Sequence, residues 1–292
     1  MSKAVHFETT DGKRWIGRLD GDDIVTAGEA PAQGFVPDEA GWTAIVAADG
    51  ERHALADVHV LAPVAPGKIL AIGLNYQAHV EETNLQRPDV PVVFAKLPSS
   101  VTGPFDDIVI PVEETRTDYE GELGIVISKR AYRVSEEDAW EYVGGFTALN
   151  DVSGRRAQLE TPMRQFTLGK SFDTFTPLGP VIASVDSVAN RDEIGVKTTI
   201  GDEVMQDGNT RQLIFDIPAL IEYLTRGVTL EPGDLIATGT PGGVGDERTP
   251  PRYLVPGDVV AVEVAGVGAI RNPVRAEDAA ASVTDRAQAD AA

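Results

Sequence analysis

The sequence predicts an α+β fold, a β-rich mixed sheet or roll preceded by a small β-rich N-terminal domain. Short apolar segments bounded by turn residues recur along the chain, as expected of strands. Pro-Gly turns at 231–234 and 255–258 each lead into such a segment, so the second half is also rich in strands. A Pro-rich connector at 61–68 predicts a domain boundary, with the N-terminal domain at 1–65 and the larger domain at 66–274.

The N-terminal domain is expected to contain short strands. Segments with β-type composition occur at Val5–Phe7, Trp15–Leu19 and Thr43–Val46, and Asp-Gly pairs mark turns near them. Three of the four histidines of the chain lie in this region, and no polar partners are near them in the sequence. We therefore expect structural or surface roles for these three histidines.

A buried strand at Ile69–Gly73 begins the larger domain, and a helix is predicted from Asn75 to Glu82 with Asn75 as its N-cap. His79 and Glu82 then lie three residues apart on one helix face. That spacing lets a carboxylate orient and charge-support an imidazole, as acid–base chemistry requires. An ordinary polar helix face has the same spacing, so both interpretations stay open at this point.

Acidic residues at 118–122 run directly into the apolar segment 123–127, which is typical of a strand with carboxylates at its mouth. Glu120 and Glu122 would point the same way, about 6–7 Å apart. Two like charges on one face repel unless water, a proton or a cation lies between them, and a hard divalent cation is the usual partner of oxygen ligands. Asp151, after a second apolar segment, would supply a third carboxylate. The alternative is the solvated face of a half-buried strand.

The remaining elements are expected to be scaffold. Helices are predicted at Ser135–Tyr142 and Ile217–Arg226 from their capping residues, and strands at Leu235–Thr238 and Val259–Val264. The Ala/Asp-rich tail at 275–292 has no apolar face, so we expect it to be disordered.

The Gly-rich segment Thr238–Gly245 lacks the Lys-Ser/Thr pair that a phosphate-binding P-loop needs, so a nucleotide is not expected. We expect instead a tight loop whose backbone N–H groups, together with the Thr240 hydroxyl, meet a carboxylate. A plain turn is the alternative.

Composition excludes several classes of function. A formal net charge of −21 argues against nucleic acid and anionic membrane surfaces as partners. The chain has no cysteine, which excludes disulfides and a cysteine nucleophile. No apolar run of about 18 residues and no signal sequence occur, so a cytoplasmic protein is expected. To bind a small carboxylate, such an acidic protein needs a local positive focus, which a metal with a nearby Lys or Arg would supply.

Five motifs stand in order along the sequence: Gly73-Leu74-Asn75-Tyr76-Gln77-Ala78-His79, Asp118–Leu123, Asn150-Asp151-Val152-Ser153, Gly169-Lys170-Ser171-Phe172-Asp173 and Thr238–Gly245. With these motifs the sequence resembles the fumarylacetoacetate hydrolase superfamily, in particular its bacterial and mitochondrial acylpyruvase-like members. The resemblance covers about residues 66–274.

The resemblance implies the fold of that family's C-terminal domain, a homodimer and a metal site. It implies that Mg²⁺, with Mn²⁺ as the alternative, is held by Glu120, Glu122 and Asp151. His79 and Glu82 would form a catalytic pair on a mobile segment, with Lys170 as a fixed positive charge beside the metal. A surface lysine is the alternative for Lys170. The implied contacts to a small carboxylate substrate come from Tyr76, Arg155, Gln158 and Thr240.

The implied reaction is hydrolysis of a carbon–carbon bond in a small 2,4-dioxo acid, with a pyruvate enolate as leaving group. Decarboxylation of an oxaloacetate-like acid and isomerisation of 2-hydroxydienoate or 2-oxo acids are the alternatives, because both use the same enolate. A metal-dependent 2-oxo acid binding protein is the non-enzymatic alternative. Leu74 replaces an Arg that many acylpyruvases have, and Arg156 stands where relatives usually carry an acidic residue, which leaves the substrate open.

Overall fold

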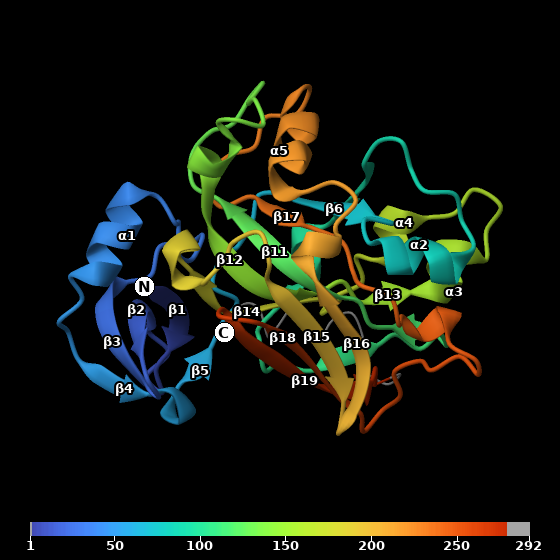
Figure 1. Cartoon of the computed structure of the whole chain (residues 1–292). Helices are drawn as coiled ribbons and strands as arrows, with labels where there is room; N and C mark the ends of the chain where they lie inside the picture. Colours follow the sequence, from blue (N-terminus) through green and yellow to red (C-terminus); the bar gives the residue numbers. More distant parts are fainter. Residues whose placement is uncertain (1, 279–292) are drawn as a thin grey trace.

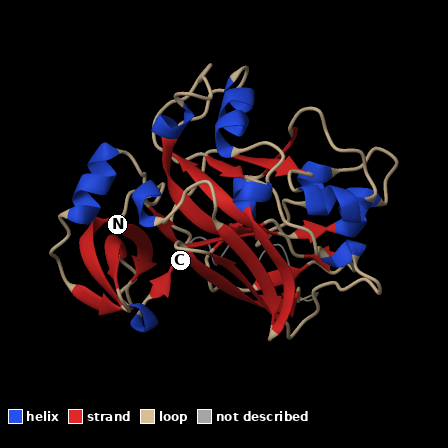
Figure 2. Ribbon diagram, in the orientation of Figure 1, coloured by secondary structure: helices blue, strands red, loops and turns tan. Residues whose placement is uncertain are grey.

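Strands dominate the computed structural model, which describes residues 2–278 (Figures 1 and 2). The large sheet is mixed and has twelve strands. Its order is β4 (Arg52–Ala54), β3 (Asp23–Glu29), β2 (Arg14–Asp20), β1 (Lys3–Glu8), β14 (Thr176–Ala183), β12 (Val143–Asn150), β11 (Gly121–Ile127), β17 (Leu235–Ala237), β6 (Ile69–Gly73) and β7 (Val92–Lys96). At its margin β5 (His59–Val60) pairs with β1, and β8 (Val101–Thr102) pairs with β14. The predicted α+β, sheet-dominated fold is confirmed.

A second sheet of five strands packs against the middle of the first. Its order is β16 (Glu203–Asn209), β15 (Gly195–Ile200), β18 (Val259–Val264), β19 (Gly268–Ala276) and β9 (Ile108–Ile110), and β10 (Thr117–Asp118) pairs separately with β13 (Ser153–Gly154). The α-helices are α1 (Glu39–Val46), α2 (Gln77–Thr83), α3 (Arg155–Leu159), α4 (Phe166–Gly169) and α5 (Ile217–Thr225). Short 3₁₀ helices occur at Leu55–Asp57, Pro98–Ser100, Ala139–Tyr142, Val185–Ser187, Thr210–Gln212 and Gly245–Glu247.

The N-terminal strands extend the large sheet, because β1 pairs antiparallel with β14. One prediction here is wrong: Thr43–Val46 belongs to α1 and not to a strand. The reason is a cap outside the segment, since the Asp38 side chain accepts a hydrogen bond from the Gly41 N–H at 2.7 Å and starts the helix earlier. Ile45 is then fully buried on one helix face. The boundary at residue 65 stays a prediction.

Strand β11 lies in the interior, with a different apolar cluster on each face. Leu123, Ile125 and Ile127 pack with residues of β12, the second sheet and α5, while Val126 packs with β14 and β17 on the other face. Every residue of β11 is buried. The carboxylates at its start are therefore not the solvated side of a half-buried strand.

Two predicted helices have different outcomes. Helix α5 is confirmed, with Asp216 as its N-cap and Leu220 and Ile221 buried. The helix predicted at Ser135–Tyr142 is wrong, because this segment is a turn followed by a 3₁₀ helix at Ala139–Tyr142. Ser135 hydrogen-bonds both the N–H and the carboxylate of Asp138, which closes a single turn where the exposed acidic residues offer no apolar face to pack.

Three predicted strands agree closely with the structure. β6 and β18 have the predicted bounds, and β17 ends one residue earlier than predicted. β19 continues to Ala276, and residues 279–292 of the expected disordered tail lie outside the described residues. No helix within the described part of the chain has the length and apolar character needed to cross a membrane.

Asn75 is not the N-cap of α2, because Tyr76 occupies that position. The Asn75 side chain is buried and joins two other segments. Its Nδ2 donates to the carbonyl oxygens of Phe215 and Thr238, at 3.0 and 2.8 Å, and its Oδ1 accepts from the Phe215 N–H at 2.9 Å. These bonds fix the entry to α2 relative to the end of β17.

Gly121 gives a test of how closely the two sheets pack. A Cβ atom at Gly121 would lie 2.1 Å from Thr198 Oγ1 and 3.0 Å from Val262 Cγ1. Gly121→Ala should lower the free energy of unfolding by about 1–3 kcal/mol in urea titrations, because the second sheet must move. Gly195→Ala is the control, since the nearest atom to its Cβ is 3.5 Å away. Equal stability of the two variants would contradict this packing.

Candidate metal and acid–base site

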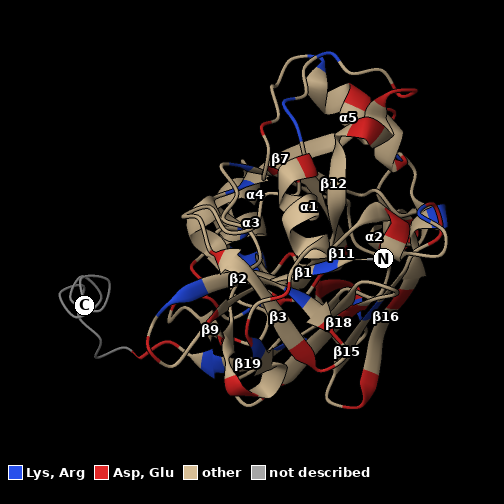
Figure 3. Cartoon of the chain, turned by 90° about the vertical axis from the view of Figure 1, so that its left-hand side faces the viewer, with Lys and Arg blue, Asp and Glu red and all other residues tan. Residues whose placement is uncertain are grey.

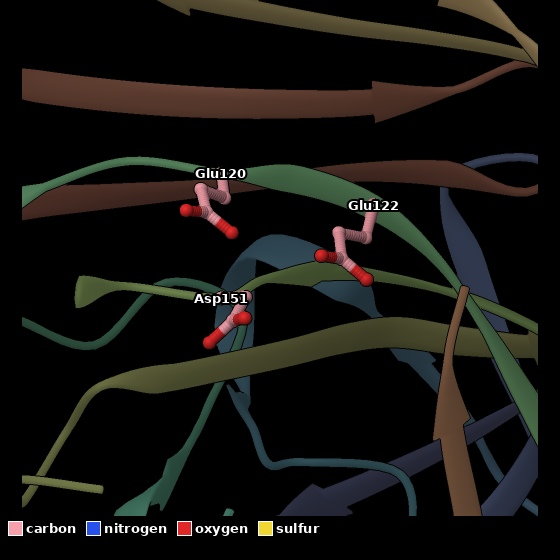
Figure 4. Close-up of side chains that lie close together, drawn as sticks. All are labelled: Glu120, Glu122 and Asp151. Atoms are coloured by element: carbon pink, nitrogen blue, oxygen red, sulfur yellow. The ribbon is translucent and has the colours of Figure 1, made fainter. Parts of the chain in front are cut away.

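Three carboxylates converge where β11 begins and β12 ends (Figure 4). Glu120 precedes β11, Glu122 lies within it, and Asp151 follows β12. One oxygen of each lies within 4.8 Å of the others, and all three residues are buried. The backbone fixes this geometry, because the Asp151 N–H donates to the Glu120 carbonyl oxygen at 2.8 Å. The structure thus brings together the three residues predicted as metal ligands.

Two buried lysines touch these carboxylates. Lys170 Nζ is 2.8 Å from Glu120 Oε2 and 2.8 Å from Asp151 Oδ2, so the alternative of a surface lysine is wrong. Lys96 Nζ is 2.6 Å from Asp151 Oδ1 and also donates to the Lys170 carbonyl oxygen. Sequence reasoning missed Lys96, although a charged residue at the end of the apolar strand Val92–Lys96 was a usable signal.

Arg155, expected to bind substrate, holds carboxylates of the protein. Its Nε and Nη2 both donate to Asp118 Oδ2, at 2.9 and 2.7 Å, and Nη2 also donates to Glu120 Oε1 at 2.7 Å. Its Nη1 donates to Gln158 Oε1 at 3.1 Å. Arg155 therefore anchors Glu120 and orients Gln158, and both Arg155 and Gln158 line the same cavity.

The balance of charge differs between the two glutamates. Burial alone would raise the pKa of the Glu120 carboxyl, but Lys170 and Arg155 outweigh it and hold that pKa well below its ordinary range. Burial, with the negative charges of Asp151 and Glu120, raises the pKa of the Glu122 carboxyl well above its ordinary range. Glu122 thus lacks sufficient positive charge around it.

This donor set fits a divalent cation. The Gly239 N–H donates to Glu122 Oε2 at 2.8 Å, and no cationic side chain bonds Glu122 within residues 2–278. Three convergent carboxylate oxygens are the ligands that hard cations such as Mg²⁺ prefer. A cation bound by all three residues would supply the charge that Glu122 lacks.

His79 and Glu82 form a hydrogen-bonded pair on α2. His79 Nδ1 lies 2.6 Å from Glu82 Oε1, and Glu82 Oε2 accepts a hydrogen bond from the Gly243 N–H at 2.6 Å. Since Nδ1 is engaged, Nε2 is the ring nitrogen left for proton exchange. His79 lines the cavity that Glu120 and Lys170 also line, so this base faces the carboxylate cluster across one space.

The Gly-rich loop does present backbone N–H groups to carboxylates, but these carboxylates belong to the protein. The N–H groups of Gly239 and Gly243 donate to Glu122 and Glu82, and that of Gly245 donates to Asp118 at 2.8 Å. The Thr240 hydroxyl donates to the Gly121 carbonyl oxygen at 3.0 Å and accepts from Gln206 Nε2 at 2.7 Å. The loop therefore aligns the site, and Thr240 also lines the cavity.

The cavity has a volume of about 220 Å³ and takes walls from α2, α3 and α4. This volume is below the roughly 300–1,000 Å³ of sites for drug-sized ligands, which favours a small substrate. Tyr76, expected to bind substrate, is buried and is not part of the cavity wall. Its hydroxyl has no hydrogen-bond partner among the described residues.

Comparisons with known proteins agree with this fold and show the family. Residues 68–275 match the fumarylacetoacetate (FAA) hydrolase C-terminal family. A mitochondrial oxaloacetate tautomerase of Xenopus laevis is 43% identical over 235 residues, which cover 80% of this chain and 74% of the relative. The fumarylacetoacetate hydrolase domain-containing protein 2 homolog of Dictyostelium discoideum is 42% identical, with 78% of this chain and 77% of the relative covered.

Solved structures show the same similarity. A fumarylacetoacetate hydrolase of Exiguobacterium antarcticum has a TM-score of 0.81 and 34% identity, covering 95% of this chain and all (100%) of that chain. A 5-carboxymethyl-2-hydroxymuconate delta-isomerase of Mycobacterium smegmatis has a TM-score of 0.78 and 33% identity, with coverage of 94% and 100%. The protein belongs to the fumarylacetoacetate hydrolase family, which is a family of enzymes.

Glu122 gives a test of the metal site by thermal unfolding. Because the folded-state pKa of this carboxyl is raised, its ionisation opposes folding as pH rises above about 4.5, the ordinary pKa. In chelator at pH 8, Glu122→Gln should therefore raise the Tm. Mg²⁺ should raise the wild-type Tm, because a free Mg²⁺ concentration of 100 times Kd stabilises the folded state by about 2.7 kcal/mol. Mg²⁺ should leave the Tm of Glu122→Gln unchanged.

Glu137→Gln, which changes an exposed glutamate, is the control and should respond to Mg²⁺ as the wild type does. A Glu122→Gln protein that gains as much stability from Mg²⁺ as the wild type would contradict the assignment of this ligand.

Proposed function

We propose that this protein is a divalent-cation-dependent enzyme that interconverts the keto and enol forms of a small 2-oxo acid such as oxaloacetate. The observation that carries the proposal is one small cavity lined by His79, whose Nδ1 is held by Glu82, and by the ion pair of Glu120 and Lys170. A proton-transfer group thus faces a site for negative charge. Support also comes from relatives named oxaloacetate tautomerase and a similar structure named an isomerase.

Glu120, Glu122 and Asp151 would hold Mg²⁺, with Mn²⁺ as the alternative, and the bound cation would supply a Lewis acid that stabilises negative charge on the 2-oxo group. Burial alone would lower the pKa of Lys170, but its contacts with Asp151 and Glu120 raise that pKa. Lys170 therefore keeps a second positive charge beside that oxygen. Gln158, Thr240 and Arg155 line the same cavity and would position the substrate carboxylate.

His79 would move the proton. Its Nε2 takes a proton from C3 of the keto acid, and the imidazolium then gives that proton to the 2-oxygen, so the enol forms with no net change in protons. The reverse path returns a proton to C3. Glu82 holds Nδ1 and stabilises the imidazolium that forms between the two steps, and the Gly243 N–H fixes the second oxygen of Glu82.

Hydrolysis of a 2,4-dioxo acid is the second candidate. His79 could instead take a proton from water, and water would then attack the distal carbonyl. The observation that supports it is the hydrogen-bonded His79–Glu82 pair, which suits activation of water as well as it suits proton transfer from C3. Decarboxylation of an oxaloacetate-like acid needs no base. A binding protein without catalysis would have no use for the pair. The homodimer and the cytoplasmic location expected from the sequence stay predictions.

Product analysis separates these candidates. With Mg²⁺, the protein should accelerate the loss of enol-oxaloacetate without releasing pyruvate. Ultraviolet absorbance monitors the enol, and chelator should abolish the acceleration. Release of acetate and pyruvate from acetylpyruvate, without faster enol loss, would instead establish a hydrolase. Pyruvate and carbon dioxide from oxaloacetate would establish a decarboxylase.

His79→Ala tests the role of the base. Turnover should fall by about 10²- to 10⁴-fold, because general acid–base catalysis typically contributes that much. The rise in Tm with Mg²⁺ should persist, since His79 is not one of the three carboxylate ligands. Full turnover in this variant would contradict the proposed proton transfer. His59→Ala, at an exposed histidine paired with Asp106, is the control.

A further inference from the structure

Three cationic side chains line the cavity, and they differ in their partners. Lys170 contacts Glu120 and Asp151, and Arg155 contacts Asp118 and Glu120. Both are buried and are engaged by carboxylates of the protein. Arg164 lines the same cavity, but its guanidinium has no ion pair with any carboxylate among residues 2–278.

The backbone holds Arg164 at this position. It follows a turn in which the Arg164 N–H donates to the Thr161 carbonyl oxygen at 3.0 Å. The next N–H, of Gln165, donates to the Gln158 carbonyl oxygen at 2.9 Å and ties the turn to α3. Arg164 has φ of 46°, a left-handed conformation that non-glycine residues rarely adopt. The turn thus places a charged side chain at the cavity at a conformational cost.

Away from Glu120 and Lys170, Arg164 is the one cationic partner that the described cavity wall offers to an anion. Much of it is apolar, formed by Leu74, Leu85, Val92 and Phe166. The acidic residues Asp246 and Glu247 also line the cavity, and Asp246 is paired with Arg116 at 2.6 Å. In this part of the cavity the acidic residues would repel an anionic group, and the apolar residues would desolvate it without a partner. Beside Arg164 the group would have a cationic partner.

We infer that Arg164 binds the second carboxylate of a dicarboxylic 2-oxo acid and makes the enzyme select diacids over monoacids of the same length. This inference rests on the proposed function, in which the first carboxylate and the 2-oxo group bind at the carboxylate cluster. A guanidinium can donate two parallel hydrogen bonds to a carboxylate, whereas a methyl group in the same place gains nothing from it.

A matched pair of acids tests the inference. Oxaloacetate and 2-oxobutanoate differ by a carboxylate in place of a methyl group, and exchange of the C3 protons in deuterium oxide reports proton transfer for both. The wild type should show a higher kcat/KM for oxaloacetate. Arg164→Gln should lower the diacid-to-monoacid ratio by about 10- to 100-fold, the loss expected for a charged hydrogen bond, and Arg164→Lys should lower it less.

Arg130→Gln is the control, because Arg130 is exposed, pairs with Glu231 and does not line the cavity. It should keep the wild-type ratio despite the same loss of charge. An unchanged ratio in Arg164→Gln, or a wild type that prefers the monoacid, would overturn the inference.

A second measurement does not depend on turnover. Calorimetry with Mg²⁺ compares malate with 2-hydroxybutanoate, two unreactive acids that differ in the same way. If Arg164→Gln loses the preference for malate, the inference is supported. This holds even if neither 2-oxo acid exchanges its C3 protons, because that failure of exchange would contradict only the proposed function. Equal binding of the two acids by the wild type would overturn the role of Arg164.

Discussion

The burial of three carboxylates in one place is the constraint on which the site depends. Glu120, Glu122 and Asp151 lie where two central strands meet, away from water, so their mutual repulsion is weakly screened. The protein offsets only part of this charge, with Lys170, Lys96 and an Arg155 that also pairs with Asp118. The negative charge that these side chains do not offset is felt mainly at the carboxyl of Glu122, whose pKa is raised. The fold therefore maintains a local excess of negative charge that a divalent cation would relieve.

The surrounding hydrogen bonds connect this cluster to the acid–base pair. The loop after β17 gives the Gly239 N–H to Glu122 and the Gly243 N–H to Glu82, so a single segment aligns a carboxylate of the cluster and the partner of His79. Acidic residues are otherwise spread over many elements, including α5 and β16 (Figure 3). Within this strongly acidic protein, Arg155, Arg164 and Lys170 place positive charge at the wall of the cavity.

Local patterns predicted much of the fold and the site. A short apolar run identified β6, a Pro-Gly turn before it identified β18, and capping identified α5. Helical spacing allowed the His79–Glu82 pair, and the family resemblance favoured it. Some failures had local causes that the predictions overlooked: the Asp38 cap begins α1 just before the expected strand, and the Ser135–Asp138 hydrogen bonds close a single turn. Others depended on contacts distant in sequence, since the Asn75 side chain bonds Phe215 and Thr238. The contacts of Lys96 and Arg155 with the carboxylates are equally non-local, and no spacing within the sequence encodes them.

The central claim is that these three carboxylates hold a divalent cation, and an experimental structure with Mn²⁺ tests it most directly. Crystals grown with Mn²⁺ and measured for anomalous scattering should show a peak about 2.1 Å from an oxygen of Glu120, Glu122 and Asp151. Its position would be shared by all three side chains. The absence of a peak there at a saturating Mn²⁺ concentration, with the fold unchanged, would contradict the account.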